Sequence, residues 1–218
     1  MPQEPWVLEQ WTLLCNDLGI DDTVSQTWYS IIRNRYSEHR RHYHTLDHIA
    51  DMLEGADIDF IRLQKRHVVR LAIFFHDLVY DPKSGKNEED SDIVFREFAK
   101  EAGLTQLDTD LVSAYIIATK QHHVSGSDDE DLRAFIDLDM AVVGRERDGY
   151  LQYASQIRQE YIHVPQHTYC RKRAEVLRSF LAKERIYATE HYHQHLEATA
   201  RANVATEIAI LDTGRTVE

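Results

Sequence analysis

Apolar residues recur every three to four positions along most of the chain, and this spacing predicts a series of amphipathic helices. The predicted helices cover residues 6–18, 24–36, 45–53, 60–80, 87–100, 107–121, a segment after 129 that ends near 140 or 144, 145–162, 167–183 and 189–211. Thr45 and Asn87 are the expected N-caps of two of them, and Pro82 cannot continue the fourth helix. No stretch alternates apolar and polar residues for long enough to predict a strand. The pattern therefore predicts an all-α fold.

Composition and charge narrow the class of protein further. The 218 residues carry a net charge of −12 without a dense basic patch, so we expect no binding to duplex nucleic acid. Two cysteines, Cys15 and Cys170, do not make a disulfide framework. The N-terminus lacks a signal pattern, and the longest apolar run, Leu71 to Phe75, is too short to cross a bilayer. We therefore expect a cytoplasmic protein that does not contact membranes.

The segment from Leu71 to Tyr80 carries the first candidate for chemistry. It is apolar on every side, which predicts a buried helix, and His76 and Asp77 lie in its middle. Burying a carboxylate without a partner is costly, so the pair must meet a cation or a hydrogen-bond network. The alternative is a buried His–Asp hydrogen bond that only supports packing.

Two other segments offer similar residues. His44 and His48 are four apart, which on a continuous helix places both on one face and suits a divalent cation. That face is opposite to Leu46, so a solvated face is the alternative. Asp137 and Asp139 interrupt an apolar run, which predicts a paired or metal-bound carboxylate, with a helix cap as the alternative.

Together these segments supply the imidazole and carboxylate groups from which Mn, Mg, Fe, Ni or Zn sites are built. A cation held by them would activate water near neutral pH and polarise a phosphoryl oxygen. Both effects are typical of metal-dependent hydrolysis.

The order of these residues resembles the HD superfamily of metal-dependent phosphohydrolases. That superfamily is defined by a histidine, a later adjacent His-Asp pair and a distal aspartate, here His48, His76-Asp77 and Asp139. The resemblance implies that these four residues are metal ligands. The segment from Tyr43 to Ile49 is also similar to the Tyr-His-Asn-x-x-His-Ala segment of cyclic nucleotide phosphodiesterases. By that resemblance His44 is the general acid and His48 a ligand.

A bacterial branch of predicted HD phosphohydrolases shares more of the pattern. Its motifs match residues 41–44, 75–77, 87–89, 119–122 and 137–139, so the resemblance covers roughly 35–145. It implies a single HD-type domain over 1–218, with this motif core and a helical C-terminal extension over 146–213. The phosphodiesterases continue as His-Asp-x-x-His, whereas Tyr80 and Asp81 stand here, so we expect one metal ion.

The resemblance extends to residues around the metal. Glu88 or Glu89 would orient the attacking water as general base, although acids in the first turn of a helix also complement its dipole. Arg41, Lys120 and His122 are candidate contacts for the substrate phosphate. Arg41 or Lys120 could equally be a surface charge.

The function implied is hydrolysis of a phosphate ester or anhydride in a nucleotide or a related small phosphate. Two other classes stay open: a di-iron HD-fold oxygenase of a small molecule, for which His122 would be an additional ligand, and a non-catalytic nucleotide-binding module. The sequence does not name the substrate, the native metal or the oligomeric state, and a homo-oligomer is compatible with it.

Overall fold

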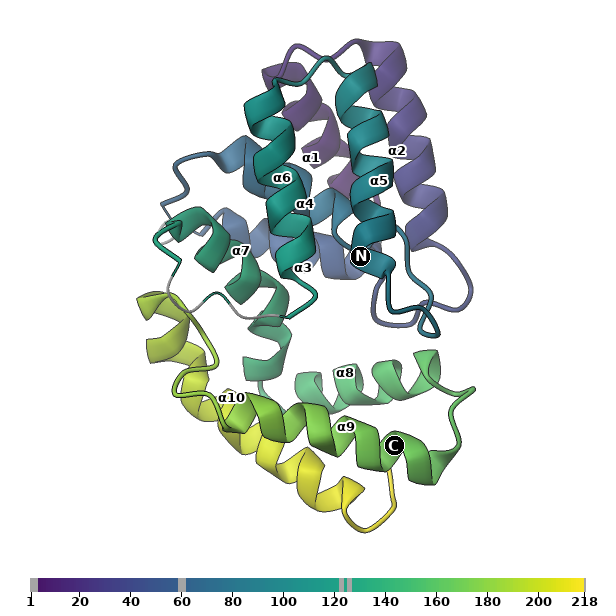
Figure 1. Cartoon of the computed structure of the whole chain (residues 1–218), viewed down its shortest axis with the longest axis vertical. Coiled ribbons are helices and arrows are strands. Elements are labelled where there is room, and N and C mark those ends of the chain that lie inside the picture. The colour runs from purple at the N-terminus through teal and green to yellow at the C-terminus, as the bar shows by residue number, and fades with distance from the viewer. Residues whose placement is uncertain (1–3, 59–61, 122–123, 125–126, 218) are drawn as a thin grey trace. The chain divides into compact units, whose positions relative to one another are not determined.

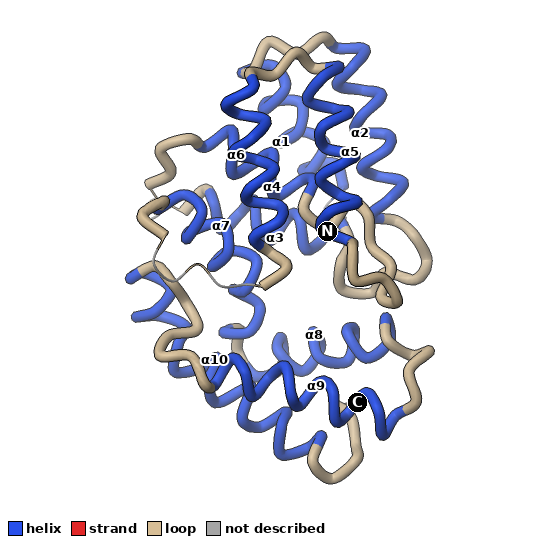
Figure 2. Tube along the Cα trace, in the orientation of Figure 1, coloured by secondary structure: helices blue, strands red, loops and turns tan. Residues whose placement is uncertain are grey.

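The computed structural model of the protein describes residues 4–58, 62–121, 124 and 127–217. Every regular element within these residues is a helix (Figure 2), which confirms the predicted all-α class. The helices are α1 (Glu4–Asp17), α2 (Asp22–Tyr36), α3 (Leu46–Ala56), α4 (Arg66–Phe75), α5 (Asn87–Glu101), α6 (Gln106–Ala118), α7 (Glu130–Met140), the short 3₁₀ helix η1 (Ala141–Gly144), α8 (Arg147–Glu160), α9 (Gln166–Leu181) and α10 (Glu190–Leu211).

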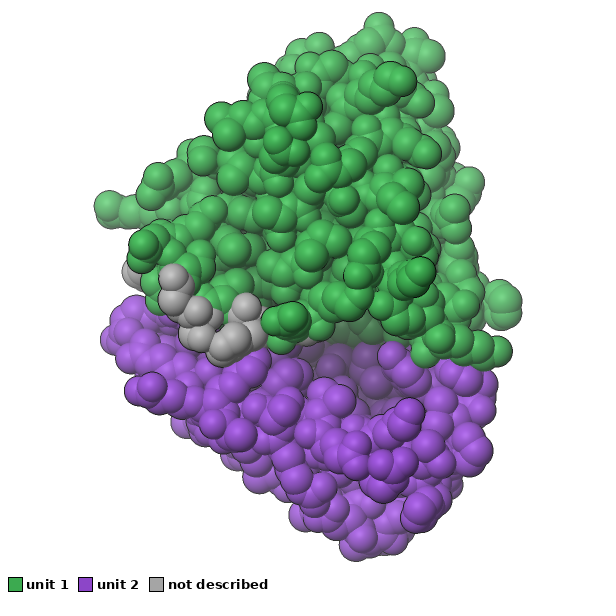
Figure 3. All heavy atoms as spheres, in the orientation of Figure 1, with its two compact units in different colours: residues 1–138 green, residues 139–218 purple. Residues whose placement is uncertain are grey.

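The chain divides into two compact units, residues 1–138 and 139–218 (Figure 3). The division falls within α7, close to the expected end of the motif core near residue 145. That all 218 residues form a single HD-type domain stays a prediction.

In the first unit α4 packs against α3, α5 and α6 (Figure 1). Its Phe75 is fully buried, and the Phe75 ring stacks on Phe98 with 4.9 Å between centroids. Phe95 lies at 5.3 Å, and Trp11 and Trp28 both lie at 6.1 Å from the same ring. Offset and edge-to-face rings at these separations attract one another beyond the effect of burial. This aromatic cluster fixes the end of α4, where His76 follows.

Two predicted helix boundaries are wrong in a way that matters for the site. The helix predicted over 60–80 is α4, which ends at Phe75, so His76 is its C-cap and Asp77 lies in the turn beyond. Residues 60 and 61 of that prediction lie outside the described residues. Asn87 is the first residue of α5 and not its N-cap, because its side chain is committed to Asp81: Asn87 Oδ1 accepts from Asp81 N and Nδ2 donates to Asp81 O, both at 3.0 Å. Thr45 is confirmed as the N-cap of α3 and accepts from Asp47 N at 3.3 Å.

In the second unit α10 packs against α9 and η1. The buried Asn203 amide donates to Val143 O at 3.0 Å and Arg145 O at 2.8 Å, which ties the end of η1 to α10. Gly144 makes this approach possible, since a Cβ built there would lie 2.6 Å from Leu196 Cβ and 2.8 Å from Tyr187 Oη.

We therefore expect Gly144→Ala to destabilise the protein by about 1–3 kcal/mol, the range for overpacking a close contact. Thermal unfolding of the variant should show a lower midpoint. Gly85→Ala is the control, because nothing lies within 4 Å of a Cβ built at that position. Equal midpoints for Gly144→Ala and wild type would contradict the packing described.

Among the described residues, no helix is both long enough and apolar enough to cross a membrane.

Candidate metal centre

The first histidine of the site comes from the start of α3. His48 lies in the first turn of α3 and is only 2% exposed, so the alternative of a solvated histidine face is wrong for this residue. The spacing predicted that His44 shares a helix face with His48. This is wrong, because His44 precedes the N-cap Thr45 and lies outside the helix. The two rings nevertheless lie near each other, with centroids 6.0 Å apart in an edge-to-face arrangement.

The His76-Asp77 pair enters the site from the end of α4. His76 Nε2 lies 3.3 Å from His48 Nε2 and 3.1 Å from Asp77 Oδ2. Together the ligand atoms of His48, His76 and Asp77 lie within 4.8 Å of one another and could hold a metal ion. The structure thus brings together three of the four predicted ligands, although they belong to segments far apart in sequence.

The contact of the second ring nitrogen of His76 indicates which of the two nitrogens carries a hydrogen. His76 Nδ1 lies 3.0 Å from Ile73 O, and since a carbonyl oxygen only accepts, this nitrogen carries a hydrogen. In a neutral imidazole the lone pair is then on Nε2, which faces the Asp77 carboxylate. A lone pair and a carboxylate oxygen at this distance repel unless a cation or a proton lies between them. Metal-binding histidines commonly donate their other ring N–H to a backbone carbonyl in this way.

The separations fit coordination of one ion. Two ligand atoms that each lie about 2.1 Å from a metal are about 3.0 Å apart at an octahedral angle and about 3.4 Å apart at a tetrahedral angle. The measured separations of His76 Nε2 from His48 Nε2 and from Asp77 Oδ2, 3.3 and 3.1 Å, fall within that interval. The three residues therefore have the chemistry to hold a divalent cation, two of their separations match its coordination, and all three ligand atoms lie within 4.8 Å of one another.

Tyr43 supports the site and was not identified as a functional residue from the sequence. Its hydroxyl lies 3.1 Å from His48 Nδ1, and its ring lies 4.8 Å from the His48 ring. If His48 held an ion through Nε2, its Nδ1–H would donate to the Tyr43 oxygen, and this hydrogen bond would fix the ring orientation. The available signal was the place of Tyr43 beside His44 in the matched motif.

Tyr43→Phe is expected to lower the affinity for Zn²⁺ by about tenfold, the effect typical of removing a hydrogen bond to a metal ligand. Competition with a chromophoric zinc chelator measures this affinity. Tyr29→Phe is the matched control, because the Tyr29 hydroxyl donates to Glu4 O at 3.1 Å in a different part of the first unit. Affinities that are equal in wild type and Tyr43→Phe would exclude this role.

His44 lies beside the cluster and is accessible. Its Nε2 is 3.8 Å from Asp77 Oδ2, its ring is 4.3 Å from the Tyr80 ring, and its side chain is 18% exposed. Partial exposure next to the ligands is compatible with the proton-donor role that the resemblance implies. That role stays a prediction.

The two aspartates of the distal motif differ in environment. Asp137 is 1% exposed in α7 and belongs to the first unit, whereas Asp139 is partly exposed and is the first residue of the second unit. The assignment of Asp139 as fourth ligand stays a prediction, and so does the alternative of Asp137.

The predicted phosphate contacts have other partners in the structure. The Arg41 side chain is 0% exposed and donates to backbone carbonyl oxygens, including Asp77 O at 2.7 Å. Lys120 Nζ donates to Gly85 O at 2.9 Å and pairs with the Glu89 carboxylate. Contact of either cation with a substrate phosphate stays a prediction, and His122 lies outside the described residues.

The same ion pair distinguishes the two candidate bases. The hydrogen bond from Lys120 holds the pKa of the Glu89 carboxyl below its usual range, which makes Glu89 a weaker base. Glu88, the other acid in the first turn of α5, is partly exposed. The ion pair with Lys120 therefore argues against Glu89 as the base, and a role for either acid stays a prediction.

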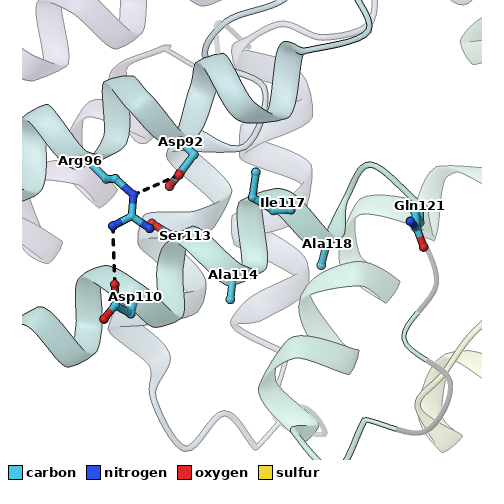
Figure 4. A pocket seen from close by; sticks show the side chains of 8 residues that line it. All are labelled: Asp92, Arg96, Asp110, Ser113, Ala114, Ile117, Ala118 and Gln121. Carbon is cyan, nitrogen blue, oxygen red and sulfur yellow. Dashed lines mark hydrogen bonds and ion pairs between the residues drawn. The ribbon is translucent and has the colours of Figure 1, made fainter.

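A separate open groove of about 550 Å³ lies between α5 and α6 (Figure 4). Arg96 in this groove is neutralised by Asp92 at 3.0 Å and by Asp110 at 3.5 Å, as the dashed lines in the figure show. Two carboxylates around one guanidinium leave the groove with a negative charge. It is therefore poorly suited to an anionic phosphate, and the cluster around His76 is the better candidate for the functional site.

Comparisons with protein-family models, curated proteins and solved structures yield no match to this chain. The resemblance to the HD superfamily therefore depends on the ordered residues themselves. What the structure adds is a buried His-His-Asp cluster that could hold a metal ion.

Proposed function

We propose that this chain is a metal-dependent phosphohydrolase of the HD type that acts on a nucleotide or a related small phosphate. One observation carries the proposal: His48 Nε2 and Asp77 Oδ2 both approach His76 Nε2, at 3.3 and 3.1 Å, and the two histidines are buried. Side chains of this kind at such separations need a cation or a proton between them, and their order along the chain is the order of the HD ligands, which favours a metal ion. A bound divalent cation would lower the pKa of a coordinated water to about 7 and polarise a phosphoryl oxygen.

The proposal gives each of these side chains a role. His48, His76 and Asp77 hold the ion, and Asp139 is the proposed fourth ligand. In the reaction, water adds to phosphorus and the bond from phosphorus to the leaving oxygen breaks. Glu88 accepts a proton from the water, and His44, whose ring borders Asp77, gives a proton to the leaving oxygen.

The test combines metal analysis of the purified protein with a hydrolysis screen. The substrates are nucleoside mono-, di- and triphosphates and cyclic nucleotides, and the readout is chromatography of the nucleotide and nucleoside products together with release of phosphate or pyrophosphate. We expect about one metal ion per chain and turnover that Asp77→Ala abolishes. Asp139→Ala and Asp137→Ala, compared in parallel, identify the distal ligand as the one whose loss removes the metal. Turnover that persists in both Asp77→Ala and Asp139→Ala would refute the proposed site.

The same preparation separates the other two classes. A di-iron oxygenase would contain two irons per chain and release no phosphate. A nucleotide-binding module would bind nucleotide tightly and leave it intact. The fit of the described cluster to a single ion supports the phosphohydrolase with one metal.

A further inference from the structure

Arg41 is a buried cation whose contacts all lie within the protein. Its side chain is 0% exposed, and its Nε lies 3.7 Å from the Glu38 carboxylate, beyond hydrogen-bond distance. The guanidinium carbon lies 4.9 Å from the centre of the Tyr36 ring and 5.3 Å from that of the Tyr80 ring. Burying a charge is costly unless it is well paired, so the contacts that Arg41 does make must offset that cost.

The hydrogen bonds of Arg41 join the two segments that carry the site. Nη1 donates to His44 O at 3.1 Å and to Asp77 O at 2.7 Å, and Nη2 donates to Leu78 O at 2.9 Å. The carbonyls of Asp77 and Leu78 lie in the turn beyond α4 and have no helical partner, because Asp81 N donates to Asn87 Oδ1 and Pro82 has no N–H. Arg41 therefore supplies donors to these two carbonyls, and it links that turn to the loop before α3.

A second contact leads from Arg41 to His44 through a ring. Tyr80, beside the guanidinium, has its ring centroid 4.3 Å from that of His44, with 31° between the planes. Arg41 thus holds the His44 backbone directly, through the carbonyl oxygen, and contacts the Tyr80 ring that packs on the His44 ring. Asp77, whose carboxylate lies 3.8 Å from His44 Nε2, is held through its carbonyl.

We propose that Arg41 is a positioning residue for the metal centre: by bridging the backbone of His44 to that of Asp77 and Leu78, it holds the His48 and His76-Asp77 segments at the separation the ion requires. The part that concerns the ion rests on the proposed function. The role suits arginine, because its planar fork presents several N–H groups in fixed directions, whereas a lysine ammonium is a single centre.

The test uses Arg41→Lys, which keeps the charge and removes the fork. Hydrogen–deuterium exchange of the metal-free protein follows peptides covering 42–48 and 76–82. The second peptide includes Leu78 N and Val79 N, which donate to Phe75 O at 3.2 Å and Ser91 Oγ at 3.0 Å. We expect faster exchange in both peptides and an affinity for Zn²⁺ about ten to a hundred times lower.

Arg201 provides a matched control from the second unit. It also donates to three backbone carbonyls, Leu181 O at 3.2 Å and Lys183 O and Glu184 O at 2.9 Å. Arg201→Lys should speed exchange near residues 181–184 and leave the zinc affinity within about twofold of wild type, since Arg201 makes these hydrogen bonds within the second unit and shares no partner with the three ligands.

Unchanged exchange in both peptides of Arg41→Lys would overturn the proposal, and so would faster exchange with an unchanged zinc affinity. If wild type binds no zinc, the metal-dependent function fails, and the exchange result alone decides whether Arg41 holds the two segments. If Arg41→Lys does not fold, Arg41→Gln replaces it, since that variant removes the buried charge together with the fork and leaves a shorter side chain with one amide donor group. It should speed exchange of 42–48, and the same exchange as in wild type would count against the proposal.

Discussion

Replacement of His76 by asparagine is expected to lower the affinity of the folded protein for Zn²⁺ by more than about a hundredfold, beyond the effect of losing an outer-shell hydrogen bond. His76 Nε2 is the atom that lies close to both other ligands, 3.3 Å from His48 Nε2 and 3.1 Å from Asp77 Oδ2. An asparagine side chain is too short to place a donor atom at the same point. The loss should appear directly as zinc released to a competing chelator.

A matched variant separates a loss of metal binding from a general loss of structure. His67→Asn changes a histidine in α4 whose Nε2 lies 3.1 Å from Asp108 Oδ1, and it should leave zinc affinity unchanged. Circular dichroism should show the same helix content in both variants. Zinc affinity retained in His76→Asn would remove this residue from the metal centre.

The second large effect concerns the aromatic cluster behind the site. Phe75→Ala is expected to destabilise the first unit by about 3–5 kcal/mol, the usual cost of truncating a fully buried phenylalanine. Phe75 is fully buried and its ring contacts Trp11, Trp28 and Phe98. The cavity left by the ring would lie directly before His76, so the end of α4 would lose its support.

Urea unfolding followed by tryptophan fluorescence measures this effect, because Trp11 and Trp28 border the cavity. The control is Leu107→Ala, because Leu107 is 66% exposed. A substitution at such an exposed position should lower the free energy of unfolding by less than about 0.5 kcal/mol. A loss below about 1 kcal/mol for Phe75→Ala, as expected of a partly exposed position, would contradict the packing at this helix end.

Much of the fold could be predicted from hydrophobic spacing, because the helices bury one face each. α10 illustrates this, since its predicted start and end, 189 and 211, agree closely with Glu190 and Leu211. The end of α4 could not be predicted, because apolar residues at helical spacing continue to Tyr80 and a period-based argument continues with them. Beyond Phe75 the backbone makes other hydrogen bonds, since Val79 N donates to Ser91 Oγ and Asp81 N to Asn87 Oδ1, and Arg41 donates to the carbonyls of Asp77 and Leu78.

The candidate site was predictable to the extent that it depends on residue type. A histidine and an aspartate in an apolar run must be compensated, and His48 and His76 do approach each other. The backbone positions from which these side chains reach the site could not be predicted. His44 lies outside the helix that carries His48, and Asp77 lies in a turn. Tyr43 and Arg41 were missed in their supporting roles. Arg41 reaches carbonyls more than thirty residues away, and Tyr43 contacts His48 from outside helix α3, where helical spacing does not apply.

The measurement that tests the central claim most directly is X-ray diffraction from crystals grown with Zn²⁺, recorded at the zinc absorption edge. Zinc suits the test because nitrogen and oxygen sites bind it more tightly than Mn²⁺ or Fe²⁺. The account predicts an anomalous peak about 2.0–2.2 Å from His48 Nε2, His76 Nε2 and an oxygen of Asp77. A map with zinc only at other histidines, such as the exposed His195, and with none between these three side chains would contradict it.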